Sequence, residues 1–275
     1  MLLMPHRCAC FGVFLLLVPS LLHAAAASSC SQQQAQAAQQ ALLAAQAALE
    51  HGAVIEGRLA LVGLVDRWPW AAVAPRALRL GCELERRAGG SMHELDFVMG
   101  VISRLAWLAE PGAGSAAGCR VAGGRALLAQ ALVRAGSLRL GVRHDAAGAL
   151  RLLQRAEQVA RGSSWEDDAL LWQGRALRSL RRREEALAAL QRAAAISGSD
   201  MGDWARLEVA ELLAQQDRHF EARRALLALL RRQPAAAVAT AARRCLASPV
   251  ASARRPSQER AADAWAPRSR DGASF

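Results

Sequence analysis

The chain has 275 residues, 53% of them apolar, and a formal net charge of +11. This composition excludes an intrinsically disordered protein, because the apolar residues suffice to fill one or two cores. All 35 basic residues are arginine, and lysine, asparagine and tyrosine are absent. Such a bias is typical of a GC-rich coding sequence, so the charge alone does not indicate nucleic-acid binding, which requires a clustered basic surface.

The first thirty residues have the features of a secretory signal peptide. Arg7 is followed by an apolar run that ends at Leu22 and then by small residues, among which Ala25-Ala26-Ala27 is a plausible cleavage site. The run is shorter than a membrane-spanning helix requires. We therefore predict a signal peptide over 1–27 and an exported protein, periplasmic or associated with the outer membrane. An uncleaved anchor and an internal apolar helix are the alternatives.

Cys30 gives the same region a second interpretation. The stretch "AASSC" resembles the lipobox of bacterial lipoproteins, in which the cysteine becomes the acylated first residue of the mature chain. A lipid at Cys30 is the only membrane contact that the sequence suggests, and ordinary cleavage near Ala27 is the alternative. Cys82, Cys119 and Cys245 also follow the signal, and their disulfide pairing is left open by the sequence.

Residues 28–110 are predicted to form an alanine- and glutamine-rich helical region. Its first part has high helix propensity, and apolar helical segments follow over 54–65 and 71–87, on either side of Pro69. After Ser91, apolar residues again recur at helical spacing. These segments suggest helical hairpins, although they contain no repeat that can be aligned.

Two segments contain few or no large apolar residues. Residues 111–119 are rich in glycine, serine and alanine, which predicts a linker. Residues 248–275 combine serine, proline and charge, which predicts a disordered basic tail. A second folded region is thereby predicted over 120–247.

Within that region the chain repeats. Ala149, Ala186 and Ala222 recur at intervals of 37 and 36 residues, and periods of this size are typical of stacked supersecondary units. With Ala186 at position 20 of a 34-residue unit, Gly174 stands at position 8 and Ala193 at position 27. Small residues at these positions resemble the tetratricopeptide repeat. The resemblance implies antiparallel helix pairs that approach closely where Gly174 faces Ala186, which would offset the cost of a glycine inside a helix.

The neighbouring units follow the same pattern less closely. The next unit closes with Pro234, although Leu229 replaces the small residue at position 27, and in the preceding unit Gly136 and Ser137 stand where one small residue is expected. A single helix over 235–247 then serves as a terminal cap. We therefore predict an all-α, tetratricopeptide-like solenoid of antiparallel helix pairs; a generic alanine-rich helical bundle is the alternative.

Members of this family bind partners along the concave surface that the first helices of the units form. On the position numbering above, the groove candidates are Arg134, Leu171, Trp172, Arg175, Arg178, Trp204, Leu207, Glu208 and Glu211. Tryptophan and arginine are enriched at binding hot spots, and Trp172, Arg175 and Arg178 lie on nearly one helix face. The alternative is that Trp172 fills a gap in the core and the arginines are solvated.

No catalytic, cofactor or metal site is predicted. The stretch "HELDF" begins at His93 like a zincin helix, but Phe97 stands where the second histidine is required. The motifs of a nucleophile elbow, a P-loop and a dinucleotide site are absent. His51, His144 and His219 are predicted at helix ends, where a cation is favoured or the side chain is solvated.

The repeat spacing and the export signal resemble two groups of bacterial envelope proteins: the Tol–Pal-associated periplasmic coordinator and the repeat-containing lipoprotein of the outer-membrane β-barrel assembly machinery. The resemblance implies a non-enzymatic scaffold that binds a protein or peptide partner in the cell envelope. Two alternatives remain. One is a self-associating structural protein that uses the glutamine-rich helix, and the other is an accessory domain of a cell-wall enzyme with carboxylates among Glu83, Glu85, Glu94 and Asp96.

Overall fold

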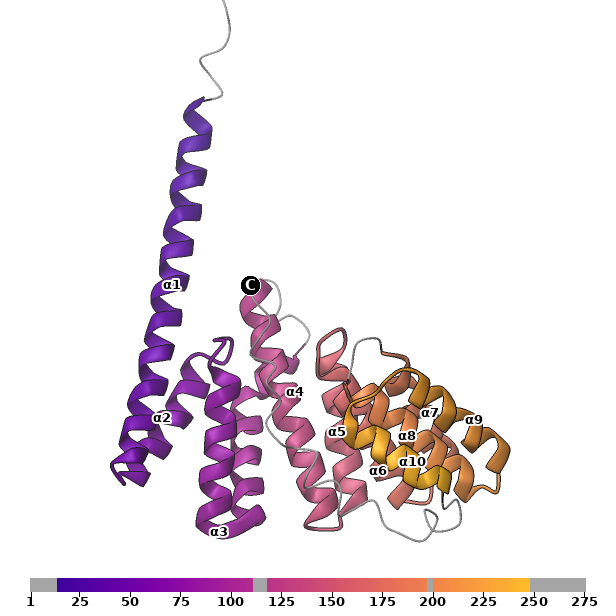
Figure 1. Ribbon diagram of the computed structural model, residues 1–275. Coiled ribbons are helices and arrows are strands. Elements are labelled where there is room, and N and C mark those ends of the chain that lie inside the picture. Colours follow the sequence, from indigo (N-terminus) through magenta and orange to yellow (C-terminus); the bar gives the residue numbers. More distant parts are fainter. Residues whose placement is uncertain (1–13, 111–117, 197–199, 248–275) are drawn as a thin grey trace, which may run out of the picture.

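The computed structural model describes residues 14–110, 118–196 and 200–247, which form helices joined by short turns (Figure 1). No strand occurs in these ranges, so the prediction of an all-α fold is confirmed for them. The start of the predicted signal peptide, most of the predicted linker and the predicted tail lie outside the described residues. None of the described helices is long and apolar enough to cross a membrane.

The helices follow one another as a row of hairpins. They are α1 (Phe14–Glu50), α2 (Val54–Arg67), α3 (Ala74–Leu105), the short 3-10 helix η1 (Ala106–Ala109), α4 (Gly118–Gly141), α5 (Ala146–Ala160), α6 (Glu166–Ser179), α7 (Arg183–Ala195), α8 (Asp200–Gln215), α9 (His219–Arg231) and α10 (Ala236–Ala247). Each helix packs against the next one along the chain. In addition, α4 contacts α6, α6 contacts α8, and α8 contacts α10. These four helices therefore form one layer, which we call the inner layer, and α5, α7 and α9 pack against it.

Helix α3 is itself a hairpin of two arms. The backbone leaves the helical conformation at Gly89 and Gly90, and Gly90 has a φ of 74°, which side chains other than glycine rarely adopt. The arms then pack so closely that the Phe97 ring occupies the space where a Cβ of Gly81 would stand. The hairpins expected from the sequence between 71 and 110 are therefore present.

Close approach at a glycine recurs in the later hairpins. A Cβ on Gly174 of α6 would lie 2.5 Å from the Cγ atom of Leu190 on α7 and 3.4 Å from the carbonyl oxygen of Ala186. The glycine thus meets the Leu190 side chain first, and Ala186 only through its backbone. On α4, a Cβ on Gly136 would lie 2.6 Å from the Cγ atom of Leu153 on α5, so Gly136 rather than Ser137 takes the equivalent position.

The same contact joins the first two helices. A Cβ on Gly57 of α2 would lie 2.5 Å from the Leu49 side chain of α1 and 3.3 Å from the carbonyl oxygen of Ala45. One cluster of buried apolar side chains then runs from Leu42 to Ala222, and a smaller cluster lies beneath α8, α9 and α10. The larger core therefore includes helices on both sides of the predicted linker.

The turns share a backbone conformation at helix ends. Left-handed φ values between 53° and 61° occur at His144, Arg181, Asp217 and Gln233, which follow α4, α6, α8 and α9. In the turn after α6, the Arg182 N–H donates to the Leu177 carbonyl 2.9 Å away, a bond that satisfies one of the last helical acceptors. His51 and His144 follow the ends of helices and His219 begins one, as predicted. The predicted terminal helix is present as α10, which packs on α8 and α9.

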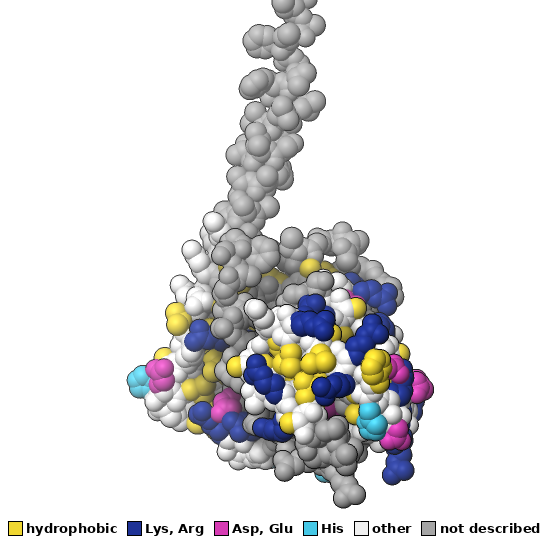
Figure 2. Space-filling model, turned by 45° about the vertical axis from the view of Figure 1, so that its right-hand side comes forward, with side chains coloured by type: hydrophobic (Ala, Val, Ile, Leu, Met, Phe, Trp, Pro, Cys, Tyr) yellow, Lys and Arg dark blue, Asp and Glu magenta, His cyan; other side chains and the backbone are white. Residues whose placement is uncertain are grey.

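Several arginine side chains lie on the surface of the last described helices. Figure 2 shows them around a hydrophobic patch on the face where α9 and α10 come forward. Exposed residues on α9 include Arg223, Arg224, Leu227 and Arg231. The positive charge of this end is therefore on the surface and does not enter the small core beneath it.

We expect Gly174→Ala to lower the free energy of unfolding by about 1 kcal/mol or more, because overpacking against Leu190 outweighs the gain in helix propensity. In a Leu190→Ala background, where the space is free, the same change should raise stability by about 0.5–1 kcal/mol. Urea unfolding of the parent chain, the two single variants and the double variant measures the coupling free energy between positions 174 and 190.

Gly63→Ala on α2 is the matched control, because no heavy atom lies within 4 Å of a Cβ at that position. This variant should be stabilised by roughly the full propensity difference of about 1 kcal/mol. Equal effects of Gly174→Ala with and without Leu190 would contradict the close-approach explanation.

Candidate functional site

The predicted groove residues lie on three helices of the inner layer. Arg134 is on α4, four of the residues are on α6, and the remaining four are on α8. Leu171 and Leu207 are buried in the core, and Trp204 is half-buried against both core clusters. The structure brings five of the others together between α6 and α8: Trp172, Arg175, Arg178, Glu208 and Glu211. We call these five residues the α6–α8 cluster.

Two arginines of α6 face two glutamates of α8 in this cluster. The Nε atom of Arg175 donates to Oε1 of Glu208 at 2.6 Å. The guanidinium of Arg178 lies 3.6 Å from Oε2 of Glu208 and 3.8 Å from Oε2 of Glu211. Because residues three apart lie on one side of a helix, both arginines point toward α8. The cluster therefore bridges two successive helix pairs.

Trp172 completes the cluster. The guanidinium carbon of Arg175 lies 4.5 Å from the centroid of the indole ring, within the range of a cation–π contact. Only 6% of Trp172 is exposed, so this side chain fills the interior. The ring and Glu208 hold Arg175 between them.

Burial determines how strongly these charges depend on one another. The Arg175 and Glu208 side chains are 7% and 5% exposed. A buried ion pair of this kind contributes little net stability, but removing one partner leaves an uncompensated charge in a dry environment. The alternative from the sequence, that the arginines are solvated, is wrong for Arg175. The main role of the cluster is structural, because its ion pairs connect α6 with α8.

A second buried pair connects α3 with α4. The Nε atom of Arg134 donates to Oε1 of Glu94 at 2.6 Å, and Glu94 is 1% exposed. The thiol of Cys82 lies close by, where burial and the Glu94 carboxylate raise its pKa far above the usual range. A thiol in this state is a poor nucleophile. Arg134 therefore takes part in a contact between hairpins and is not gathered into the α6–α8 cluster.

The structure gives no support to a shared catalytic function for the four acidic residues of α3. Glu83 pairs with arginines of its own helix, Glu85 pairs with α2, and Glu94 pairs with α4, while Asp96 is exposed. Within the described residues, no group of three or more His, Cys, Asp or Glu side chains could hold a metal ion.

Cys82 and Cys245 are buried and form no disulfide with each other. The side chains of Cys30 and Cys119 lie outside the described residues, so lipidation of Cys30 stays a prediction.

Sequence reasoning found the residues of the α6–α8 cluster but missed their mutual pairing. A signal was present, because the pattern places basic residues on the first helix of one unit and acidic residues on the first helix of the next. First helices of adjacent units pack side by side, so opposite charges at these positions can meet. The missing information was the register between units.

The chain matches no protein-family model, and no curated protein matches its sequence. No relative therefore assigns a role to the α6–α8 cluster or to any other residue.

We expect Glu208→Gln to lower the free energy of unfolding by about 3 kcal/mol, because Arg175 then remains charged and buried without its counter-charge. The double variant Arg175→Met/Glu208→Leu should recover most of this loss, since it removes both charges and keeps the volume. Chemical unfolding followed by circular dichroism measures both.

Glu185→Gln is the control, because Glu185 forms an exposed pair with Arg182. Exposed pairs contribute little, so this variant should keep nearly the stability of the parent chain. If Arg175→Met/Glu208→Leu is no more stable than Glu208→Gln, the contact between α6 and α8 does not depend on charge compensation.

Proposed function

We propose that this chain is a non-enzymatic scaffold of tetratricopeptide-like helix pairs that binds a protein or peptide partner in the cell envelope. The observation that carries the proposal is the serial contact of α4, α6, α8 and α10. Stacked repeats with this arrangement present their first helices as one extended surface, which such proteins use for binding. Location in the envelope is inferred only from the signal-like N-terminus.

The α6–α8 cluster supports the proposal through the ion pairs that join the first helices of two adjacent units. Ion pairs across the two helices fix the spacing of adjacent units, and a preorganised surface loses less entropy when a partner binds. The buried pair of Arg175 and Glu208 joins the two helices of this surface. Trp204, which is half-buried on α8, is the aromatic residue of this layer best placed to contact a partner.

Photo-crosslinking tests the proposal directly. A benzoyl-phenylalanine at position 204 should form an adduct with a discrete partner in intact cells, and Arg178→Ala should weaken the adduct by changing the same surface. Circular dichroism checks that both variants keep their helical content.

The matched control carries the photo-reactive group at position 220, because Phe220 is 79% exposed on α9 and lies outside the inner layer. An adduct of equal yield at 204 and 220, or none at 204, would overturn the assignment of the inner layer as the binding surface.

A second candidate function is self-association through α1 and α2. Four large apolar side chains of this hairpin are unusually exposed: Leu43 at 55%, Val54 at 46%, Ile55 at 71% and Leu59 at 65%. Leu43 is on α1 and the other three are on α2, where Ile55 and Leu59 lie one turn apart; exposed apolar residues that share a helix face can form an interaction surface. This observation favours the hairpin as a contact between copies of the chain.

If copies associate in this way, Ile55→Ser/Leu59→Ser should convert an oligomer of the full chain to a monomer in light scattering. Phe220→Ser, which removes an exposed aromatic side chain elsewhere, should leave the mass unchanged. A parent chain that is monomeric at micromolar concentration would exclude this candidate without affecting the proposal for the inner layer.

A further inference from the structure

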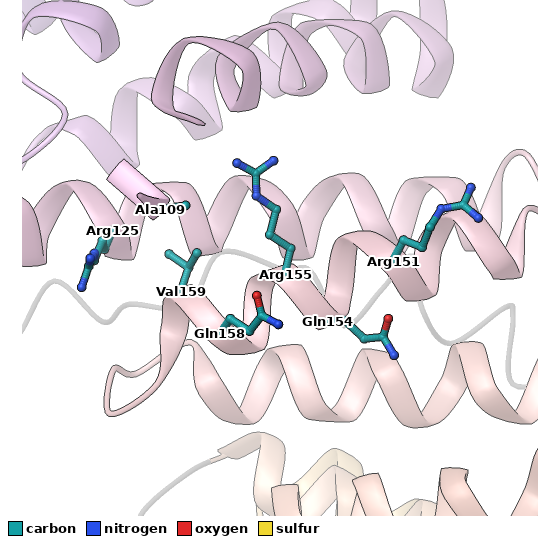
Figure 3. A pocket seen from close by; sticks show the side chains of 7 residues that line it. All are labelled: Ala109, Arg125, Arg151, Gln154, Arg155, Gln158 and Val159. Atoms are coloured by element: carbon teal, nitrogen blue, oxygen red, sulfur yellow. The ribbon is translucent and has the colours of Figure 1, made fainter. Parts of the chain in front are cut away.

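A cleft of about 550 Å³ opens beside α5. It is lined by η1, by Arg125 of α4, and by Arg151, Gln154, Arg155 and Gln158 of α5 (Figure 3). These α5 residues are spaced by three or four positions, so they share one side of the helix. Figure 3 shows the three arginines spread along the cleft, with Arg155 between Arg125 and Arg151.

Positive charge predominates in the cleft, although one carboxylate lies near its Arg151 end. Asp145 is the N-cap residue of α5, and the Gly148 N–H, Arg139 and Arg151 together lower the pKa of its carboxyl. No acidic side chain lines it, and within the described residues neither Arg151 nor Arg155 has a carboxylate within ion-pair distance. The nearest acidic residue of α5 along the chain, Glu157, is held elsewhere: Gln173 of α6 donates to it at 2.7 Å, and Arg192 of α7 pairs with it. The arginines of the cleft therefore remain available to an anion.

Arg125 is positioned for such a role by the backbone. Its Nε atom donates to the carbonyl oxygen of Leu108 at 2.9 Å, which fixes the guanidinium beside η1. The remaining N–H groups of a guanidinium can donate two parallel hydrogen bonds to one carboxylate. Since one end of the cleft is already ordered, less entropy is lost there when a ligand binds.

We propose that this cleft binds an acidic peptide segment of a partner protein. Arginines spaced along the cleft fit successive carboxylates, and the amides of Gln154 and Gln158 can both donate to and accept from a peptide backbone. The stretch from Arg151 to Gln158 spans about 10 Å, or roughly three residues of an extended chain. No aromatic side chain lines the cleft, whereas single-stranded nucleic acid is usually held by stacking on such residues.

This inference goes beyond the proposed function and does not rest on it. The cleft lies against α5 and reaches the inner layer only through Arg125 of α4, and it shares no residue with the α6–α8 cluster. Loss of binding at one surface therefore leaves the other to be tested separately.

Binding of a fluorescein-labelled hexaglutamate peptide to the full chain, followed by fluorescence anisotropy, tests the proposal. Arg151→Glu/Arg155→Glu should weaken binding by at least about tenfold, because it places carboxylates opposite the peptide. Arg151→Gln/Arg155→Gln, which removes the charge with little change in shape, should give a smaller loss and guards against misfolding of the first variant. Affinity should also fall as salt is raised.

Arg223→Glu/Arg224→Glu is the matched control, since it makes the same change in net charge on exposed residues of α9. It should bind within about threefold of the parent chain, because distant surface charges are screened. An equal loss in this control would overturn the site, as would equal binding of a hexaglutamine peptide. Tripolyphosphate or oligothymidylate binding more tightly than hexaglutamate, and lost in Arg151→Glu/Arg155→Glu, would overturn the peptide assignment.

Discussion

Close packing of a glycine against a leucine joins the helices of three pairs: α1 with α2, α4 with α5, and α6 with α7. Two antiparallel helices approach closely only where one of them presents no side chain, and Gly174 leaves that space to Leu190. Burying a leucine stabilises the fold by about 2 kcal/mol, which exceeds the cost of about 1 kcal/mol for a glycine inside a helix. Gly136 with Leu153 repeats the arrangement in α4 and α5.

Contacts between hairpins use a different chemistry. Arg175 with Glu208 joins α6 to α8 through a buried hydrogen bond of 2.6 Å, and Arg134 with Glu94 joins α3 to α4 through a partly buried one of the same length. Apolar packing is tolerant of small shifts along a helix, whereas a buried charge must meet its partner at one place. We infer that the small residues set the distance within a pair and the ion pairs set the register between pairs. The ion pair between Arg134 and Glu94 shows that the same kind of contact also joins a helix that precedes residue 111 to the repeats.

The sequence predicted the helices and the importance of Gly174, because period and helix propensity are local properties. It missed the register. In the first repeat Gly136 takes the close position because four residues separate α4 from α5, whereas three separate α6 from α7. A pattern aligned on Ala149 is therefore displaced by one residue on the first helix. The contact of Gly57 with Leu49 was missed for a related reason: a short turn places these residues only eight apart, so no long period reveals them.

A GC-rich coding sequence explains why every basic residue is arginine, but it does not explain where on the structure the charges lie. Some guanidinium groups are neutralised inside the structure, as Arg175 is by Glu208. Others, such as Arg151 and Arg155, share a cleft that no carboxylate lines. Base composition of the coding sequence affects which residue is used, so it cannot account for the difference between arginines that form ion pairs and those that do not. Lysine would also be less effective in either setting, because the guanidinium plane allows both the contact with Trp172 and two-point binding of a carboxylate. The distribution of charge over the helices, more than its sum, is therefore the property that bears on function.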